Sequence, residues 1–178
     1  MIIYFKGDAN LVEERLKILR FLNELSGRVG LKEFAQRTGM SRGSIIGYVR
    51  GLVRAGYVNK VGRGYSISAE GKTAIKALGR IPEGMEFRFY TGAGQYAGLS
   101  AKSFKEFCDL LKEVDVKAIE FHASREDFEN WIKGVFNDTQ LAQEMAKLRE
   151  SKLAGEDLRK EIVSITAAKY DKFKKLLT

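Results

Sequence analysis

The chain has 178 residues, of which 44% are hydrophobic and 30% are charged. It therefore holds enough apolar material for one domain or two small ones, and a disordered chain is excluded. The formal net charge is +8. Residues 1–80 contribute +9, from 15 Lys and Arg against 6 Asp and Glu, whereas residues 81–178 contribute −1, from 16 against 17. A basic half beside a neutral half indicates that the first half binds a polyanion. The alternative is that its basic residues form an ordinary solvated surface.

Other classes of protein are excluded by what the sequence lacks. A single cysteine, Cys108, allows no disulfide framework and no cysteine-based zinc site within one chain. No apolar run approaches the ~20 residues of a membrane span, and the N-terminus does not have the pattern of a signal peptide. We therefore expect a cytoplasmic protein with no membrane association, no metal and no cofactor. Abundant Lys, Arg and Glu with few Asn, Gln and Cys are typical of a thermophile.

Two helices are predicted at the start of the chain. Apolar residues recur at helical spacing from Leu11 to about residue 26. Residues 1–6, before this helix, are expected to form a short strand or a packed tail. A second, short helix begins at Leu31, and it leads into a turn in which Gly39 can take a positive φ.

A third helix and a hairpin follow. Ser41 is placed to cap the helix with its side-chain oxygen, and Gly56 is placed to end it. The apolar residues of this helix recur at i, i+4 and i+7: Ile45, Val49 and Leu52. Two strands, Tyr57–Lys60 and Tyr65–Ser68, are then joined through the glycine-flanked Arg63. The order of helix, turn, capped helix and hairpin is that of a winged helix-turn-helix, a fold that binds duplex DNA.

The third helix is expected to present one side to DNA. If it buries its three apolar residues, rotation by about 100° per residue turns a set of polar and small residues outward. Together with the wing they form the predicted DNA-binding site: Ser41, Arg42, Ser44, Gly47, Tyr48, Arg50, Arg54, Lys60 and Arg63.

The members of this site are expected to play different parts. Arg42 lies in the first turn of the helix, from which recognition helices reach base edges, and its guanidinium suits O6 and N7 of guanine. Tyr48 is expected to contact a phosphate or a thymine methyl group. The remaining basic residues are better placed as phosphate ligands: Arg50, Arg54, Lys60 and Arg63. Arg63, at the tip of the wing, can instead enter the minor groove.

Gly43, Gly47 and Gly51 recur on one side of the third helix. Each costs about 1 kcal/mol relative to Ala in a helix interior, so a packing reason is expected. Either the DNA backbone or a neighbouring helix approaches closely there, and we favour the neighbouring helix. Because the glycines leave few side chains for base contacts, sequence specificity is expected to be modest.

Residues 11–78 resemble the winged-helix transcription regulators of archaea and bacteria. The resemblance rests on LKEFA at 31–35, Gly39-Met40-Ser41, LVRAGY at 52–57, and YSIS at 65–68 followed by Glu70-Gly71. It implies a DNA-binding regulator, although members often carry polar or basic residues where this chain has Gly47 and Gly51. Winged helices also serve as protein-interaction modules, so the alternative function is an adaptor that docks on transcription or replication machinery.

The second half alternates strands and helices. The segment 79–84 holds the only proline and is the expected boundary, after a fourth helix at 69–78. We predict strands at 85–90 and 116–122, and helices at 100–114, 126–136, 139–153 and 156–177. A strand at 162–166 is an alternative, because that run is rich in β-branched residues. The glycine-containing segment 90–98 lacks a complete phosphate-binding motif and is expected to be a flexible loop that could line a small effector pocket.

His122 is the only histidine of the chain and the obvious catalytic candidate. A core or capping role is favoured, because no nucleophile with a partner, no second metal ligand and no phosphate loop accompanies it. Ser124 is expected to cap the next helix, with Asp127 completing a capping box. An enzyme that uses His122 is therefore a minor alternative, and we expect no catalytic residues.

Residues 85–160 also resemble an archaeal domain family of unknown function. The resemblance rests on FRFYTG at 87–92, Phe121-His122, Arg125, Asp127-Phe128, Trp131-Ile132, and Asp138 with Leu141-Ala142. It brings no established activity with it.

The sequence thus predicts an α+β protein with a winged helix-turn-helix domain at 1–80 and a small C-terminal α/β domain at 85–178, made of two strands and three to four helices. We expect a transcription regulator that binds double-stranded DNA as a homodimer, since DNA readers often pair to match two half-sites. The C-terminal domain is expected to sense a small-molecule effector, bind a protein partner or mediate oligomerisation.

Overall fold

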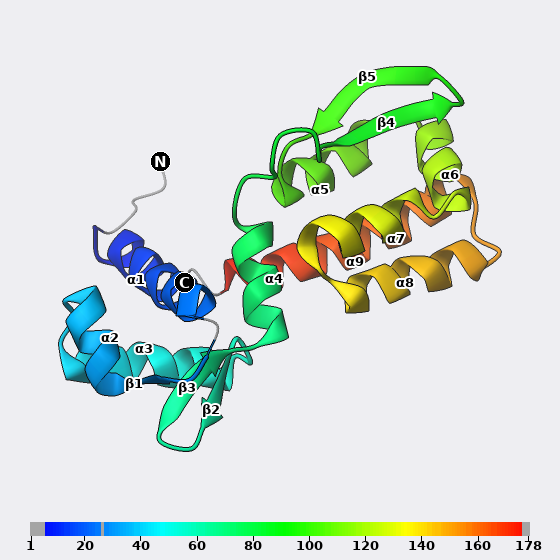
Figure 1. Ribbon diagram of the computed structural model, residues 1–178. Helices are drawn as coiled ribbons and strands as arrows, with labels where there is room; N and C mark the ends of the chain where they lie inside the picture. Colours follow the sequence, from blue (N-terminus) through cyan, green and yellow to red (C-terminus); the bar gives the residue numbers. More distant parts are fainter. Residues whose placement is uncertain (1–5, 26, 176–178) are drawn as a thin grey trace. The chain divides into compact units, whose positions relative to one another are not determined.

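The computed structural model describes residues 6–25 and 27–175 (Figure 1). Within them the chain divides into two compact units. Lys76–Lys172 form the second unit, and the described residues on either side of that stretch form the first. The prediction of a strand or tail at residues 1–6 lies outside the described part, except for Lys6, with which α1 begins. Helices and strands occur in both units, which confirms the α+β class.

The first unit follows the predicted order of helices and hairpin. Its elements are α1 (Lys6–Leu25), β1 (Val29–Gly30), α2 (Leu31–Thr38), α3 (Arg42–Arg54), β2 (Val58–Val61), β3 (Gly64–Ile67) and most of α4 (Ala69–Ala77). β1 was not predicted, because two residues carry no periodic signal. β3 lies between β1 and β2 and is antiparallel to both, with Tyr65 opposite Val29 and Ile67 opposite Val58. The hairpin of β2 and β3, which follows the helix-turn-helix, is the wing. Together with β1, which precedes α2, it forms a small three-stranded sheet.

The apolar faces of α1, α2 and α3 form the core of this unit. The rings of Phe21 and Phe34 meet edge to face at 5.2 Å, which joins α1 to α2. Ile45 and Val49 are 0% exposed and Leu52 is 2% exposed, so the spacing predicted for the third helix is confirmed. Because these three residues face inward, the opposite side of α3 is left to solvent.

α4 is anchored to the base of the wing at Ser68 and Gly71. Ser68 Oγ donates a hydrogen bond to the Gly56 carbonyl (2.7 Å) and accepts one from the Gly71 N–H (3.0 Å). A Cβ at Gly71 would collide with the carbonyl oxygen of Tyr57 and stand 2.8 Å from Cγ1 of Ile67. The close approach of α4 to the wing therefore depends on glycine at this position.

The second unit is an antiparallel hairpin backed by helices (Figure 1). Its elements are β4 (Phe87–Gly92), β5 (Gln95–Ala101), α5 (Phe104–Glu113), α6 (Val116–Ser124), α7 (Asp127–Trp131), the π-helical turn η1 (Ile132–Phe136), α8 (Thr139–Glu150) and α9 (Gly155–Lys174). Its core is aromatic, since these rings are no more than 1% exposed: Phe89, Phe104, Phe107, Phe128 and Phe136. The helix α9 covers residues 162–166, so the strand alternative there is wrong.

The predicted strand at 116–122 is also wrong, because α6 covers it. Asp115 caps this helix: its Oδ1 accepts a hydrogen bond from the Lys117 N–H at 2.8 Å. Buried residues follow at i, i+1, i+4 and i+5, which is a helical period rather than alternation: Ala118, Ile119, His122 and Ala123. The aspartate cap and this spacing outweigh the strand preference of two β-branched residues.

The second strand of the unit is β5. The segment 90–98, which was predicted to be a flexible loop, contains the end of β4, the turn and the start of β5. That prediction is wrong: Tyr90 pairs with Tyr96 across the hairpin, and their ring centroids lie 5.5 Å apart. Gly94 has φ 72° and makes the tight turn. The glycines that suggested a loop instead supply the turn of a hairpin.

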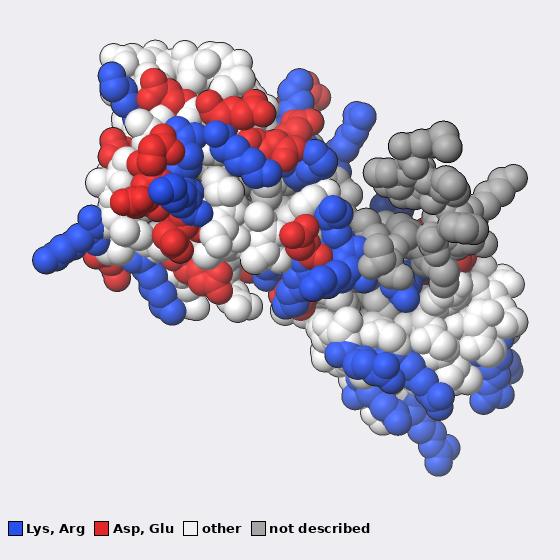
Figure 2. Space-filling model, turned by 180° about the vertical axis from the view of Figure 1, so that it is seen from behind, with Lys and Arg blue, Asp and Glu red and all other residues white. Residues whose placement is uncertain are grey.

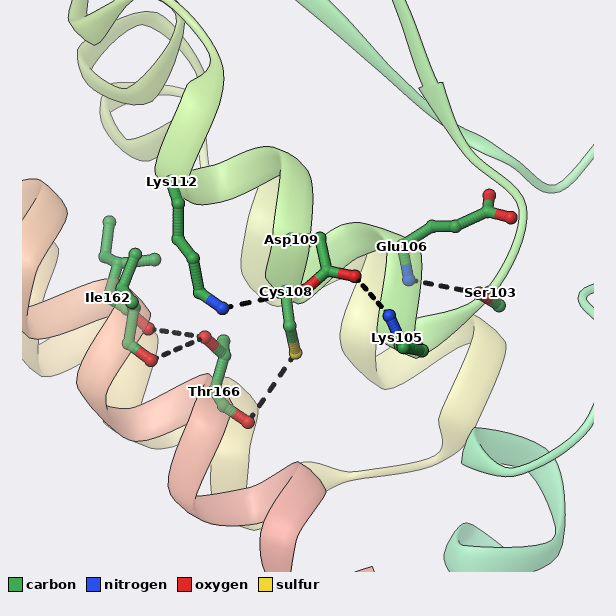
Figure 3. Close-up of polar contacts among 9 residues, drawn as sticks. Ser103, Lys105, Glu106, Cys108, Asp109, Lys112, Ile162 and Thr166 are labelled. Carbon is green, nitrogen blue, oxygen red and sulfur yellow. Dashed lines mark hydrogen bonds and ion pairs between the residues drawn. The ribbon is translucent and has the colours of Figure 1, made fainter. Parts of the chain in front are cut away.

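Cys108 is sealed between α5 and α9 (Figure 3). Its Sγ donates to the Thr166 carbonyl at 3.7 Å, and Thr166 Oγ1 donates to the Ile162 carbonyl at 2.8 Å. Burial raises the pKa of the Cys108 thiol to about 12, so the thiol stays protonated at neutral pH. The only cysteine of the chain is therefore a packing residue, inert as a nucleophile.

Candidate nucleic-acid interface

The turn between α2 and α3 is built by local hydrogen bonds. Gly39 has φ 69°, as predicted, and its N–H donates to the Ala35 carbonyl at 3.1 Å. Thr38 Oγ1 donates to the Phe34 carbonyl at 2.7 Å and accepts from the Met40 N–H at 3.3 Å. These bonds tie the backbone of Gly39 and Met40 to the last turn of α2, so the turn that leads into α3 is fixed locally.

Ser41 caps α3, as predicted. Its Oγ accepts a hydrogen bond from the Ser44 N–H at 3.1 Å and lies 2.9 Å from Ser44 Oγ. The first turn of α3 contains no acidic residue, so no carboxylate of this turn neutralises the positive end of the helix dipole, and Arg42 adds to the positive charge there. An anion such as a phosphate is favoured at an end of this kind.

The structure places every predicted DNA-binding residue at the surface of the first unit. Tyr48 is half-buried, and the others are exposed: Ser41, Arg42, Ser44, Gly47, Arg50, Arg54, Lys60 and Arg63. Seven of the nine come from α3 and its cap, and two come from the wing. Their roles toward bases and phosphates stay predictions.

Our favoured explanation of the glycine stripe is wrong. Gly43, Gly47 and Gly51 are exposed, and no helix of the described residues packs against them. A Cβ would meet nothing within 4 Å at Gly47 or Gly51, and only Ser41 Oγ, at 3.9 Å, at Gly43. The stripe therefore lies on the open side of α3, together with the arginines. The remaining explanation is close approach of a ligand to the helix backbone.

The wing carries a basic residue that the sequence did not single out. Arg28 precedes the short strand β1, and its side chain crosses β3: a Cβ at Gly64 would lie 2.6 Å from Arg28 Cγ and 2.8 Å from the Val29 carbonyl oxygen. A Cβ at Gly62, in the turn of the wing, would lie 3.6 Å from a guanidinium nitrogen of Arg28. Arg28 thus joins Lys60 and Arg63 at the wing. Only the register of β1 against β3 could have revealed this.

Eight basic residues lie between positions 28 and 63, against one acidic residue, Glu33. All eight are exposed: Arg28, Lys32, Arg37, Arg42, Arg50, Arg54, Lys60 and Arg63. We call them the basic set. None of them forms an ion pair or a side-chain hydrogen bond with any residue in the described part of the chain. Figure 2 shows Lys and Arg gathered on the first unit with almost no acidic residue beside them, whereas the second unit mixes both signs.

His122 in the second unit has a structural role. Its Nε2 accepts a hydrogen bond from the Tyr90 N–H at 2.8 Å, so the ring proton lies on Nδ1, which donates to Asp127 Oδ2 at 2.8 Å. Burial lowers the pKa of His122, and this effect outweighs the opposing effect of Asp127. Because both ring nitrogens are engaged and the side chain is 4% exposed, His122 is not available as a general base.

The predicted cap of the following helix is wrong. Ser124 Oγ donates back to the Phe121 carbonyl at 2.9 Å, and Glu126, with φ 64°, precedes α7 without a side-chain cap. Because α7 begins only at Asp127, Ser124 does not lie at its N-cap and no capping box can form; the Asp127 carboxylate accepts a hydrogen bond from His122 instead.

Comparison with known proteins adds one finding. Residues 13–62 match the model of the IclR helix-turn-helix domain. The matched stretch runs from α1 through α3 and β2 to the wing turn, so it contains most of the basic set. No curated protein and no solved structure matches the chain.

The fold and the matched domain together define the class: a protein with an N-terminal winged helix-turn-helix. Its helix-turn-helix is similar to that of the IclR regulators, which indicates a DNA-binding transcription regulator. An IclR helix-turn-helix is a DNA-binding module and not a catalytic one. The similarity to an archaeal family of unknown function in the second unit is not confirmed by these comparisons.

Among the residues that the structure describes, no group of three or more His, Cys, Asp or Glu side chains is arranged to hold a metal ion. None of the described helices is both long and apolar enough to cross a membrane.

Proposed function

We propose that the protein regulates transcription by binding double-stranded DNA through α3 and the wing. The observation that carries the proposal is the basic set: eight exposed basic side chains on one winged helix-turn-helix, none of them paired with a described residue. Like charges held close together destabilise a folded domain. A polyanion relieves this repulsion, and duplex DNA presents phosphates along both edges of the groove that a recognition helix enters.

The glycine stripe supports the same assignment. Gly47 and Gly51 face open space on the arginine side of α3, so the helix backbone can come close to a ligand there. In a groove, such an approach brings Arg50 and Arg54, which lie on the glycine side, beside phosphates, whereas Arg42 reaches base edges from the exposed start of the helix. Because few side chains line this face, affinity should depend more on phosphates than on base sequence.

Two parts of the proposal go further. The protein acts in the cytoplasm as a homodimer, so that two copies of α3 match two half-sites of DNA. The second unit then serves as an effector-sensing or oligomerisation domain. Sedimentation of the purified protein with and without DNA checks the dimer.

The test is binding of the full-length protein to duplex DNA, measured by fluorescence anisotropy over a series of salt concentrations. We expect binding at ~50 mM salt that weakens steeply as salt rises, because phosphate contacts release counterions. Arg63→Ala should weaken binding to every sequence and lower the salt slope by about 1. Arg42→Ala should reduce the difference between a selected sequence and random DNA.

Lys17→Ala is the matched control. Lys17 lies on α1 in the same unit but is paired with Glu14 at 3.0 Å, so its loss should leave DNA affinity unchanged. Absence of binding at ~50 mM salt would refute the proposal. It would favour the adaptor function, in which the winged helix docks on transcription or replication machinery.

A further inference from the structure

A pocket of about 510 Å³ opens beside β4 in the second unit. It is bounded by the outer edge of β4, the turn of the β4–β5 hairpin, the end of α6 and one side of α7. Its volume lies within the ~300–1,000 Å³ of small-molecule sites. Nothing in the comparisons assigns a ligand to this part of the chain.

The walls of the pocket are fixed before any ligand binds. His122 accepts the Tyr90 N–H at 2.8 Å, and Trp131 Nε1 donates to the Met85 carbonyl at 2.8 Å. Two side chains from the helices thus hold the chain on either side of Phe87: His122 at Tyr90 in β4, and Trp131 at Met85 just before β4. A strand edge held in this way does not need to rearrange, so little ordering cost falls on the ligand.

Two polar side chains of the pocket lack a partner among the described residues and offer donors: the guanidinium of Arg88, and the amide of Asn130, whose oxygen can also accept. Arg88, on β4, and Asn130, on α7, line the pocket, are exposed, and form no side-chain hydrogen bond or ion pair with any described residue. The guanidinium of Arg125 lies 5.1 Å above the ring of Phe121. Its Nε is 3.5 Å from Asp127, a longer contact than a good ion pair.

The two carboxylates of the pocket are already engaged. Glu86 Oε1 accepts from the Gly84 N–H at 3.2 Å, and Asp127 Oδ2 is held by His122 at 2.8 Å. The charged group that is left for a ligand is Arg88, and its unpaired guanidinium favours an acceptor that carries negative charge. Carboxylate and phosphate groups share this chemistry.

The apolar part of the pocket is aromatic. Tyr90 and Trp131 line it, and Trp131 packs edge to face on Phe87 with 5.2 Å between the rings. Gly92 and Gly94 line the turn side and leave that side free of large side chains. Flat walls of this kind fit a planar ring.

We propose that this pocket binds a small organic anion, a carboxylate or a phosphate carried on a planar ring. Arg88 and Asn130 hold the anion, and Tyr90 and Trp131 contact the ring. Binding itself does not depend on the DNA-binding function. A role of this ligand as the effector of DNA binding rests on the function proposed above.

Trp131 gives a direct readout, because it is the only tryptophan of the chain and lines the pocket. The full-length protein is titrated with benzoate, a carboxylate on a ring, and with AMP, a phosphate on a planar base, while its fluorescence is followed. Benzyl alcohol, a ring without charge, and inorganic phosphate, a charge without a ring, are the control probes. We expect saturable binding of benzoate or AMP that is stronger than that of either control, and the stronger of the two identifies the anion.

Arg88→Gln should weaken this binding about tenfold or more, because a charge-assisted hydrogen bond is lost. Asn130→Ala should weaken it less. Arg80→Gln is the matched control: it removes an exposed arginine of the same unit that does not line the pocket, and ligand affinity should not change. The proposal is overturned if neither benzoate nor AMP binds, if benzyl alcohol binds equally well, or if Arg88→Gln binds like the unaltered protein.

Failure of this proposal can be told from failure of the proposed function. Arg42→Ala should lose DNA discrimination and keep ligand affinity, whereas Arg88→Gln without ligand should keep DNA affinity. If the protein binds no DNA, the fluorescence titrations still decide whether the pocket is a ligand site.

Discussion

The two units use the same basic residue types in opposite ways. In the second unit, several lysines and arginines are paired inside the unit: Arg149 Nε lies 3.1 Å from Glu129, and Lys169 Nζ lies 2.9 Å from Asp138. In the first unit, no member of the basic set is paired with a described residue. Paired charges are neutralised within the unit. Unpaired charges of one sign repel each other, which opposes folding and favours binding of a partner of the opposite charge. The comparison predicts that the buried pair of the second unit, Lys169 and Asp138, matters for stability, and that the basic set matters for DNA binding.

The largest effect is expected at the buried pair of the second unit. Lys169 is 9% and Asp138 is 4% exposed, and Asp138 Oδ1 also caps α8 by accepting from the Leu141 N–H at 3.0 Å. Lys169→Met leaves the carboxylate buried without its cation, which should lower the free energy of unfolding by about 3–5 kcal/mol. Urea denaturation followed by Trp131 fluorescence measures this loss.

Lys105→Met provides the matched control for that experiment. Lys105 is paired with Asp109 at 2.6 Å on the exposed side of α5 (Figure 3), and such surface pairs contribute at most about 1 kcal/mol. Equal losses in the two variants would contradict the assignment of Lys169 and Asp138 as a buried structural pair.

Two glycines of the first unit should respond in opposite directions to alanine. Gly71→Ala drives a methyl group into the Tyr57 carbonyl, which should destabilise the protein by about 3 kcal/mol. Gly47→Ala places its methyl group in open space and should stabilise α3 by about 1 kcal/mol. Thermal unfolding followed by circular dichroism separates the two. A loss of stability in Gly47→Ala would show that the glycine stripe serves the fold.

Gly47→Ala also tests the approach of DNA to α3. If the helix backbone lies close to the groove, the added methyl group weakens DNA binding although the protein is more stable. Undiminished DNA affinity would show that the stripe does not face the ligand.

The smallest effect is a pH dependence of stability that arises at His122. Burial lowers the pKa of His122 in the folded protein, whereas in the unfolded chain it titrates near pH 6.5. The unfolded chain therefore binds the proton more readily, and stability should fall as the pH drops below about 6.5. Because His122 is the only histidine, His122→Gln should flatten this slope below about pH 6.5. A slope that persists in the variant would assign it to other groups.

The parts of the fold that could be predicted are those with local signals. Ser41, Gly39 and Gly56 act on backbone within a few residues of themselves, so the helix-turn-helix, its cap and its end were predicted correctly. β1 and Arg28 could not be found, because their place depends on pairing with β3, more than 30 residues later in the chain. The side to which the glycine stripe faces was likewise set by tertiary packing.

The errors in the second unit have the same origin. His122 is held by Tyr90, which is 32 residues away in the sequence, and no local pattern reports that contact. Asp127 has the spacing of a capping box, yet its carboxylate accepts a hydrogen bond from the His122 imidazole instead. The hairpin at 90–98 was missed because glycine signals a loop and a turn equally well.

The central claim is that the basic set, and not the net charge of the chain, binds DNA. Two variants remove four positive charges each: Arg42, Arg50, Arg54 and Arg63 to Gln in the first unit, and Lys105, Lys112, Lys117 and Lys133 to Gln in the second. Duplex binding is measured against salt for both. We predict that the first variant loses most of its affinity and that its salt slope falls by about three, at roughly 0.9 for each of the phosphate contacts of Arg50, Arg54 and Arg63, while the second binds like the unaltered protein. Equal losses in the two variants, or no loss in the first, would contradict the claim.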